Sequence, residues 1–154
     1  MLKRFRTRRF KGFTLIELLI GVAIIGILAG IAVPNLLTAQ KRSRYAQAAS
    51  DTKTATIQGI VYSNDRGRNP GSIEALRVGG YTNVADTDPW ANPWVCSVAF
   101  GDTNIPLNQG EMGVCSKGPV NNGDCSYPMT SPGVSVQDGS VGYSNVYGSW
   151  QGQV

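Results

Sequence analysis

Three residues near the N-terminus have types and spacing suited to a cleavage and a charge pairing. Gly12 and Phe13 follow a basic stretch, and glycine lets an extended backbone enter a narrow protease cleft. Cleavage after Gly12 would give Phe13 a free α-amine, whose ordinary pKa of about 8 makes it cationic at neutral pH. Glu17 follows inside an apolar run, where a carboxylate costs about 2.5 to 3.5 kcal/mol at the centre of a membrane helix. The amine of a staggered neighbouring copy would neutralise it.

The composition excludes the commonest catalytic machinery. The chain has 154 residues and no histidine, which rules out Ser-His-Asp and Cys-His pairs and removes the commonest transition-metal ligand. A zinc site would need more ligands than its three cysteines supply. The formal charge of +4 includes six cations before Gly12, and without them eight positive charges face ten negative ones, a net −2. We therefore expect a structural protein that is not an enzyme and does not bind nucleic acid.

An apolar helix of membrane-spanning length must hold Glu17. No side chain in residues 18–33 is polar, and the apolar segment 13–37 has about the length that a bilayer core demands. More cations precede this segment than follow it, so the positive-inside rule places the N-terminus in the cytoplasm and the rest of the chain outside. A cleavable secretory signal with a cut site at residues 29–32 is the competing interpretation.

The junction and the helix together resemble the type IV pilin and pseudopilin superfamily. Residues 12–18 (GFTLIEL) are similar to its prepilin peptidase site, and residues 1–12 to its basic leader. The resemblance implies cleavage after Gly12, N-methylation of Phe13, and a role for Glu17 in setting the stagger of subunits in a filament. It also implies an α+β, type IV pilin-like fold in which a long N-terminal helix, membrane-spanning in its first half, packs against a small antiparallel sheet.

The span contains glycines and a proline that bear on helix packing. Gly26 and Gly30 form a small-xxx-small pattern, which lets membrane helices approach closely. Pro34 lacks a backbone donor, so we expect it to kink or locally melt the helix where the lipid-length run ends. The superfamily resemblance points the same way.

Residues 38–62 predict an amphipathic continuation of the same helix. They hold one glycine and no proline, and a weak apolar stripe recurs at helical spacing: Ala39, Ala46, Ala49, Ile57 and Ile60. Three cations, Lys41, Arg42 and Arg44, would lie at the level of the lipid headgroups. Alternatively, they would meet acidic residues of a neighbouring subunit.

Residues 63–154 predict a periplasmic head with a short helix and a β-rich region. Turn formers at 63–71 should stop the long helix, and Ser72 should cap a short helix over 72–78. Strands are expected at 94–100, 112–117 and 139–147. Three or four such strands would lie across the outer half of the long helix and bury its apolar stripe.

Residues 88–94 (DPWANPW) carry a second resemblance. Two X-Pro units and two tryptophans predict a rigid turn whose aromatic faces cover the base of the sheet. A long helix, a short helix and this stretch resemble the major pseudopilin of type II secretion systems, where Asp-Pro-Trp-Gly-Asn-Pro-aromatic precedes the first strand. Here Ala91 replaces the usual glycine and Trp94 the usual tyrosine.

The cysteines predict one disulfide and one free thiol in an oxidising compartment. Cys115 with Cys125 would close a loop of about ten residues, worth on the order of 2 to 3 kcal/mol. Cys96 with Cys115 would instead join two adjacent strands. The sequence favours the first pairing without excluding the second.

Calcium is the one cofactor that the resemblance raises, because major pseudopilins hold this ion in their C-terminal loops. The candidate oxygen donors are Asp102, Asp124 and Asp138, helped by Asn104 or Asn122. Their spacing matches no pattern that assigns the site, and solvated loop acids are the simpler interpretation.

The sequence thus predicts a filament subunit, first of all the major pseudopilin of a type II secretion machine. Its partners would be copies of itself, the prepilin peptidase and methyltransferase, the inner-membrane assembly platform and minor pilins. It would span the inner membrane once before assembly and lie in a periplasmic or extracellular filament afterwards. The alternatives are a type IV pilus pilin for adhesion, motility or DNA uptake, and a membrane-tethered periplasmic binding module.

Overall fold

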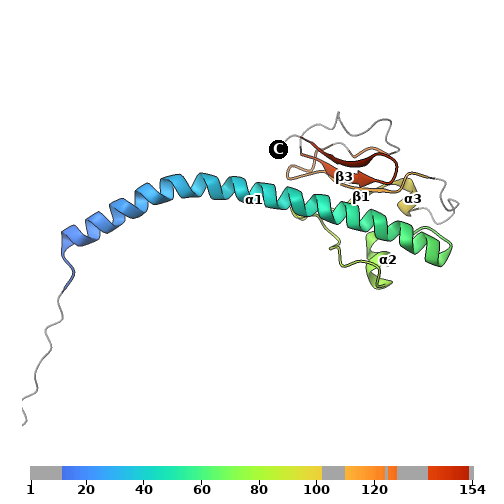
Figure 1. Ribbon diagram of the computed structural model, residues 1–154, viewed down its shortest axis with the longest axis horizontal. Helices are drawn as coiled ribbons and strands as arrows, with labels where there is room; N and C mark the ends of the chain where they lie inside the picture. Colours follow the sequence, from blue (N-terminus) through green and yellow to red (C-terminus); the bar gives the residue numbers. More distant parts are fainter. Residues whose placement is uncertain (1–11, 102–109, 124, 128–138, 153–154) are drawn as a thin grey trace, which may run out of the picture. The chain divides into compact units, whose positions relative to one another are not determined.

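The long helix α1 ends at a glycine and not at the first turn-forming residue. In the computed structural model, which describes residues 12–101, 110–123, 125–127 and 139–152, α1 spans Leu15–Arg66, 52 residues (Figure 1). The buried Ser63 hydroxyl lies 2.9 Å from the Gly59 carbonyl oxygen, which keeps Ser63 inside the helix. Gly67 has a φ of 66°, and this left-handed residue ends α1. The long helix is confirmed, but it runs one turn further than predicted.

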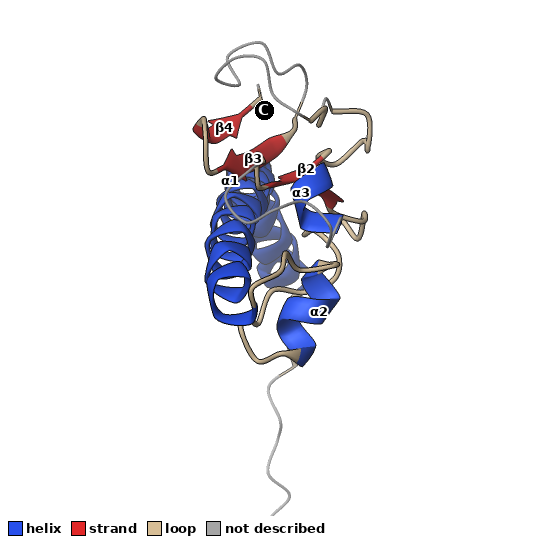
Figure 2. Ribbon diagram, turned by 90° about the vertical axis from the view of Figure 1, so that its right-hand side faces the viewer, coloured by secondary structure: helices blue, strands red, loops and turns tan. Residues whose placement is uncertain are grey.

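The chain divides into two units, residues 1–40 and 41–154. The first unit contains the N-terminal part of α1, where every described residue is exposed except the half-buried Gly21. The second unit contains the rest of α1 and all the other helices and strands. In this second unit the sheet and the short helix α2 lie on different sides of α1 (Figures 1 and 2).

The short helix α2 spans Ile73–Val78, as its capping residues predict. The Ser72 side chain accepts a hydrogen bond of 3.1 Å from the Ala75 N–H, and Gly79 caps the C-terminus. Ile73 and Leu76 are buried in the same hydrophobic cluster as Ala55 and Tyr62 of α1. The prediction of this helix is confirmed.

The described strands form one antiparallel sheet in the order β1-β2-β3-β4. Their bounds are Val95–Cys96, Gly113–Ser116, Val141–Ser144 and Gly148–Gln151. The strand predicted at 112–117 is confirmed. The one predicted at 94–100 is wrong beyond Cys96, because the chain turns into the short helix α3, Val98–Gly101. The strand predicted at 139–147 ends at Ser144, and a turn leads into β4, which the sequence analysis missed.

Small and hydroxyl residues make up the face of α1 that packs on the sheet. The buried positions recur at helical spacing: Tyr45, Ala48, Thr52, Ala55, Thr56, Gly59, Tyr62 and Ser63. Gly59 allows a close approach, because a Cβ there would lie 2.8 Å from Phe100 Cε2 and 2.9 Å from Met112 Sδ. The Thr52 hydroxyl donates to the Ala49 carbonyl at 3.1 Å, so its burial leaves no unpaired donor.

The predicted apolar stripe is therefore only partly the core-facing surface, since Ala49 and Ile60 pack against the core and the other three residues do not. Ala39, Ala46 and Ile57 are exposed, and Ala49 and Ile60 are half-buried. Ile57 keeps 40% of its surface exposed. Hydropathy alone could not identify the true face, because threonine, serine and glycine do not count as apolar although they pack closely.

Aromatic rings cover glycines on the sheet face that points away from α1. A Cβ at Gly142 would collide with the Trp150 ring, and one at Gly113 would lie 2.7 Å from Tyr127 Cε1. The two rings meet edge to face with centroids 6.3 Å apart. The head is thus packed on both faces of β2 and β3.

Candidate functional site

The Gly12-Phe13 bond lies in non-helical backbone just before α1. Phe13 is 85% exposed, and nothing lies within 4 Å of where a Cβ on Gly12 would be. Among the described residues, no side chain therefore shields this peptide bond. A protease requires such access to the bond that it cuts.

Glu17 closes a capping box with Thr14 at the start of α1. The Thr14 hydroxyl and N–H donate to Glu17 Oε2 at 2.9 and 3.2 Å, and the Glu17 N–H donates to Thr14 Oγ1 at 3.3 Å. This reciprocal arrangement satisfies backbone donors that a helix N-terminus leaves unpaired. The sequence analysis missed it, although a threonine three residues before a glutamate is its known signature.

The carboxylate of Glu17 has hydrogen bonds but, among the described residues, no cation paired with it. The six cations before Gly12 lie outside the described residues. Cleavage after Gly12 would create a positive amine four residues from Glu17, at the end of the helix where its side chain already points. Glu17 is therefore placed to exchange a neutral hydrogen-bond partner for a charged one.

The helix that follows Glu17 presents an apolar surface without cover. Within the described part of the chain, α1 is the one helix long and apolar enough to cross a membrane, and its most apolar window is not buried at all. A Cβ placed on Gly21, Gly26 or Gly30 would meet nothing within 4 Å. These glycines therefore make no close packing contact within the described residues.

Pro34 does not interrupt α1. The Asn35 amide donates to the Ile31 carbonyl at 3.2 Å, and the Thr38 hydroxyl donates to the Pro34 carbonyl at 3.0 Å. These side-chain hydrogen bonds lie within one turn of Pro34, which has no backbone N–H to donate. The helix therefore does not melt at Pro34 in this chain, and the kink stays a prediction.

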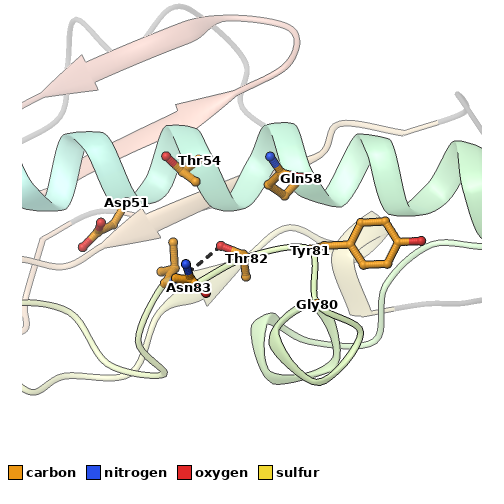
Figure 3. Close-up of a pocket in the computed structure, with 8 residues that line it drawn as sticks. Asp51, Thr54, Gln58, Gly80, Tyr81, Thr82 and Asn83 are labelled. Carbon is orange, nitrogen blue, oxygen red and sulfur yellow. Dashed lines mark hydrogen bonds between the residues drawn. The ribbon is translucent and has the colours of Figure 1, made fainter.

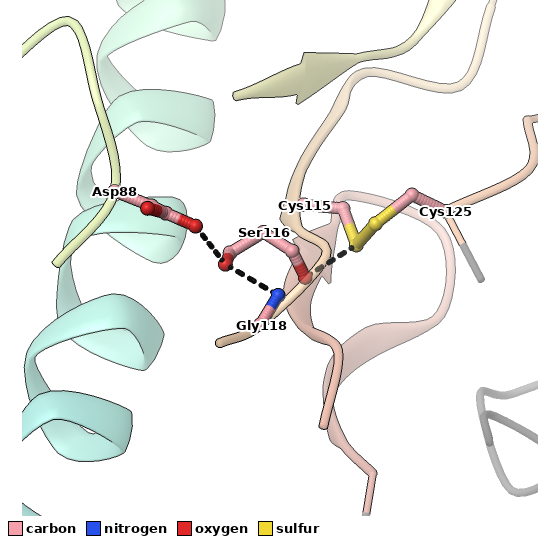
Figure 4. Close-up of a disulfide and its surroundings, with 5 residues drawn as sticks. All are labelled: Asp88, Cys115, Ser116, Gly118 and Cys125. Atoms are coloured by element: carbon pink, nitrogen blue, oxygen red, sulfur yellow. Dashed lines mark hydrogen bonds between the residues drawn. A yellow bond between two sulfur atoms is a disulfide. The ribbon is translucent and has the colours of Figure 1, made fainter. Parts of the chain in front are cut away.

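A disulfide joins Cys115 to Cys125, with their Cα atoms 5.9 Å apart (Figure 4). Cys96 is free, and burial raises the pKa of its thiol to about 11. Cys96 is opposite Val114 in the sheet, whereas Cys115 is opposite Val95. Neighbouring residues of a strand point to opposite faces, so the alternative pairing of Cys96 with Cys115 is wrong.

The buried Asp88 fixes the tryptophan-containing turn to the strand that carries the disulfide. Its Oδ1 accepts hydrogen bonds from the Asn92 and Trp90 N–H groups at 2.7 and 3.0 Å. Its Oδ2 accepts a hydrogen bond from the Ser116 hydroxyl at 2.6 Å (Figure 4). The Gly118 N–H in turn donates to Ser116 Oγ at 3.0 Å. This network explains why an aspartate opens the turn, a role that the sequence analysis did not assign.

The two tryptophans of the turn pack as expected against the base of the head. Trp90 meets Tyr45 of α1 edge to face, with ring centroids 4.8 Å apart. Trp94 packs against the core and donates its indole N–H to the Ala85 carbonyl at 2.9 Å. Ala91 has a φ of 66°, the left-handed conformation that favours glycine.

The calcium candidates Asp102, Asp124 and Asp138 lie outside the described residues, as does Asn104, and Asn122 is exposed in a loop. Among the residues that the structure does describe, no three acidic or cysteine side chains come together as a metal site.

Comparison with known proteins finds two groups of relatives. The prokaryotic N-terminal methylation motif matches residues 7–33. Type II secretion system core protein G of Aeromonas hydrophila is 32% identical over 103 residues, 56% of this chain and 72% of that protein. Core protein G of Vibrio cholerae is also 32% identical, over 58% of this chain and 71% of its own length. The type IV major pilin PilA of Myxococcus xanthus is 54% identical over 39% of this chain and 27% of the pilin.

The matches to core protein G extend well beyond the methylation motif and cover most of those relatives. The fold of this chain, a long N-terminal helix followed by a small antiparallel sheet, is consistent with the pilin-like fold. The chain therefore belongs to the superfamily of type IV pilins and type II secretion pseudopilins.

Proposed function

We propose that this protein is the major pseudopilin of a type II secretion machine, a structural subunit of a filament. The observation that carries the proposal is an apolar helix with one carboxylate and no cover, attached to a separately packed head. The match to core protein G over 72% of that relative supports the secretion role. Burial of the helix among its own copies would drive assembly.

We expect membrane insertion, processing and assembly of the chain to follow one another. The chain enters the inner membrane with its N-terminus in the cytoplasm, and a prepilin peptidase then cuts after Gly12 and methylates Phe13. An inner-membrane assembly platform, together with minor pilins, adds the mature subunit to a filament whose heads lie in the periplasm or beyond. Glu17 of each subunit pairs with the amine of a neighbouring Phe13 and fixes their register.

Intact mass and N-terminal sequencing of protein extracted from membranes test the processing step. We expect loss of residues 1–12 and one added methyl group on Phe13. A chain that keeps residues 1–12 and stays monomeric in the native membrane would instead indicate a membrane-tethered binding module, and would contradict the proposal.

A type IV pilus pilin is the second candidate function. It is favoured by the higher identity to pilins over shorter stretches, 54% to PilA of Myxococcus xanthus and 67% over 36 residues to PilA4 of Thermus thermophilus. Deletion of the gene separates the two. Loss of protein secretion with intact surface fibres supports the pseudopilin, whereas loss of surface fibres with normal secretion supports the pilin.

A further inference from the structure

A polar groove opens along one side of α1 in the second unit. Asp51, Thr54 and Gln58 of α1 form one wall, and residues 80–84 form the other (Figure 3). The groove has a volume of about 390 Å³ and is open to solvent. Asp51 is the one charged side chain among its lining residues, so the groove suits a cationic occupant.

Among the residues that the structure describes, no cation forms an ion pair with Asp51. The residues one turn away on α1 are Gln47, Ala48, Thr54 and Ala55, and none is basic. The ion pair found within the described part of the chain joins Arg77 to Asp86 and does not involve Asp51. Partial burial raises the pKa of Asp51, opposed by a hydrogen bond with Gln47. A partly desolvated carboxylate of this kind gains from a cation that enters the groove.

The matching cation lies on the opposite side of the same helix. Arg42 is exposed, and its neighbours one turn away, Thr38, Ala39, Tyr45 and Ala46, include no acid. It precedes Asp51 by nine residues, which is about 2.5 helical turns. The two side chains therefore lie on opposite sides of the helix and about 13.5 Å apart along its axis. Arg42 also continues the outward-facing stripe of Ala46 and Ile57, which nothing in the described residues covers.

We propose that the Asp51 groove of one copy receives Arg42 of the next copy in the filament. The inference rests on the proposed function, because copies inserted into one membrane in the same orientation are parallel. Parallel copies that repeat along an open helical assembly contact each other through two different faces. A shift of about 13.5 Å brings Arg42 of one copy level with Asp51 of its neighbour.

Charge exchange in the full chain tests this contact, with fibres sheared from producing cells and compared with total subunit by immunoblot. Asp51→Arg places two cations together and should lower the fibre yield about tenfold at unchanged subunit level, since like charges at an interface repel. Adding Arg42→Asp should restore the yield to within about twofold of the unmodified chain.

Arg44 provides the matched control, because it lies seven residues before Asp51 and thus on the same side of α1. Asp51→Arg with Arg44→Asp has the same net charge and should not restore fibres. Restoration by the Arg44 exchange, or failure of the Arg42 exchange, would overturn the proposal.

Cross-linking gives a second readout that does not depend on charge. Asp51→Cys with Arg42→Cys should yield a ladder of covalent oligomers in assembled fibres, whereas either single variant should not. A double variant that forms fibres without a ladder would contradict the contact. If the unmodified chain forms no fibres and keeps residues 1–12, the proposed function itself is wrong; if it forms fibres while the exchanges fail, only the Arg42 contact is wrong.

Discussion

Gly59 and Gly26 belong to the same helix but have opposite surroundings. A Cβ on Gly59 would meet Phe100 and Met112, whereas a Cβ on Gly26 would meet nothing within 4 Å. The difference follows the division of the chain: residues 41–66 of α1 pack against their own head, and residues 15–40 have no cover within the described structure. One part of the helix is stabilised by folding, and the other is left for assembly.

Glu17→Ala should produce the largest effect of these variants, and it should affect filament assembly but not the stability of the head. Breaking a buried ion pair costs about 3 to 5 kcal/mol, so the fibre yield should fall about a hundredfold or more. Total subunit and the thermal unfolding of the head should not change. Asp65→Ala, which removes an exposed acid near the end of α1, is the control and should leave the fibre yield unchanged. Normal fibres from the Glu17 variant would refute a register role for this carboxylate.

Removal of the disulfide should act on the head and spare the apolar helix. Cys115→Ser together with Cys125→Ser opens a ten-residue loop and should lower the free energy of unfolding by about 2 to 3 kcal/mol. Near-ultraviolet circular dichroism of the full chain in detergent, followed against temperature, measures this loss. Cys96→Ser is the matched control, because Cys96 is free, and an equal loss there would mean that thiol packing and not the cross-link is responsible.

A pair of glycine variants tests the comparison directly. Gly59→Val overpacks the contact with Phe100 and should destabilise the head by about 1 to 3 kcal/mol. Gly26→Val should leave head unfolding unchanged but lower the fibre yield, since a larger side chain keeps neighbouring helices apart. Thermal unfolding followed by circular dichroism measures the first effect, and the yield of sheared fibres measures the second. If Gly26→Val assembles normally, its glycine has no packing role between copies.

Ala91→Gly should have the smallest effect and the opposite sign. Ala91 holds a left-handed φ of 66°, which costs a non-glycine residue about 1 to 2 kcal/mol. Glycine removes this cost but gains freedom in the unfolded chain, so we expect a net stabilisation of about 0.5 to 1 kcal/mol. Ala85→Gly, at another exposed loop position, should not stabilise the head. A lower melting temperature for the Ala91 variant would contradict the strain argument.

The sequence was informative where a local signal decides the structure. Ser72 and Gly79 mark the two ends of α2, and the apolar run predicts the long helix whatever follows it. The capping box of Thr14 and Glu17 is equally local, because both of its residues lie within one turn of the helix start.

The sequence was misleading where the outcome depends on distant contacts. The face of α1 that packs on the sheet is set by close approach of Gly59 to Phe100, 41 residues later in the chain, and no hydropathy pattern records such a contact. The role of Asp88 likewise depends on Ser116, 28 residues away. The proposed contact of Arg42 with Asp51 also depends on distant residues, because residues 80–84 form the second wall of the groove beside Asp51.

The brevity of β1 has a consequence for crowded heads. A fibre holds many copies of the same sheet at very high local concentration, the condition under which exposed strand edges recruit one another. The edge strand β1 consists only of Val95–Cys96, because the chain continues into α3 at Val98. Strand addition between neighbouring heads is thus limited at this edge of the sheet.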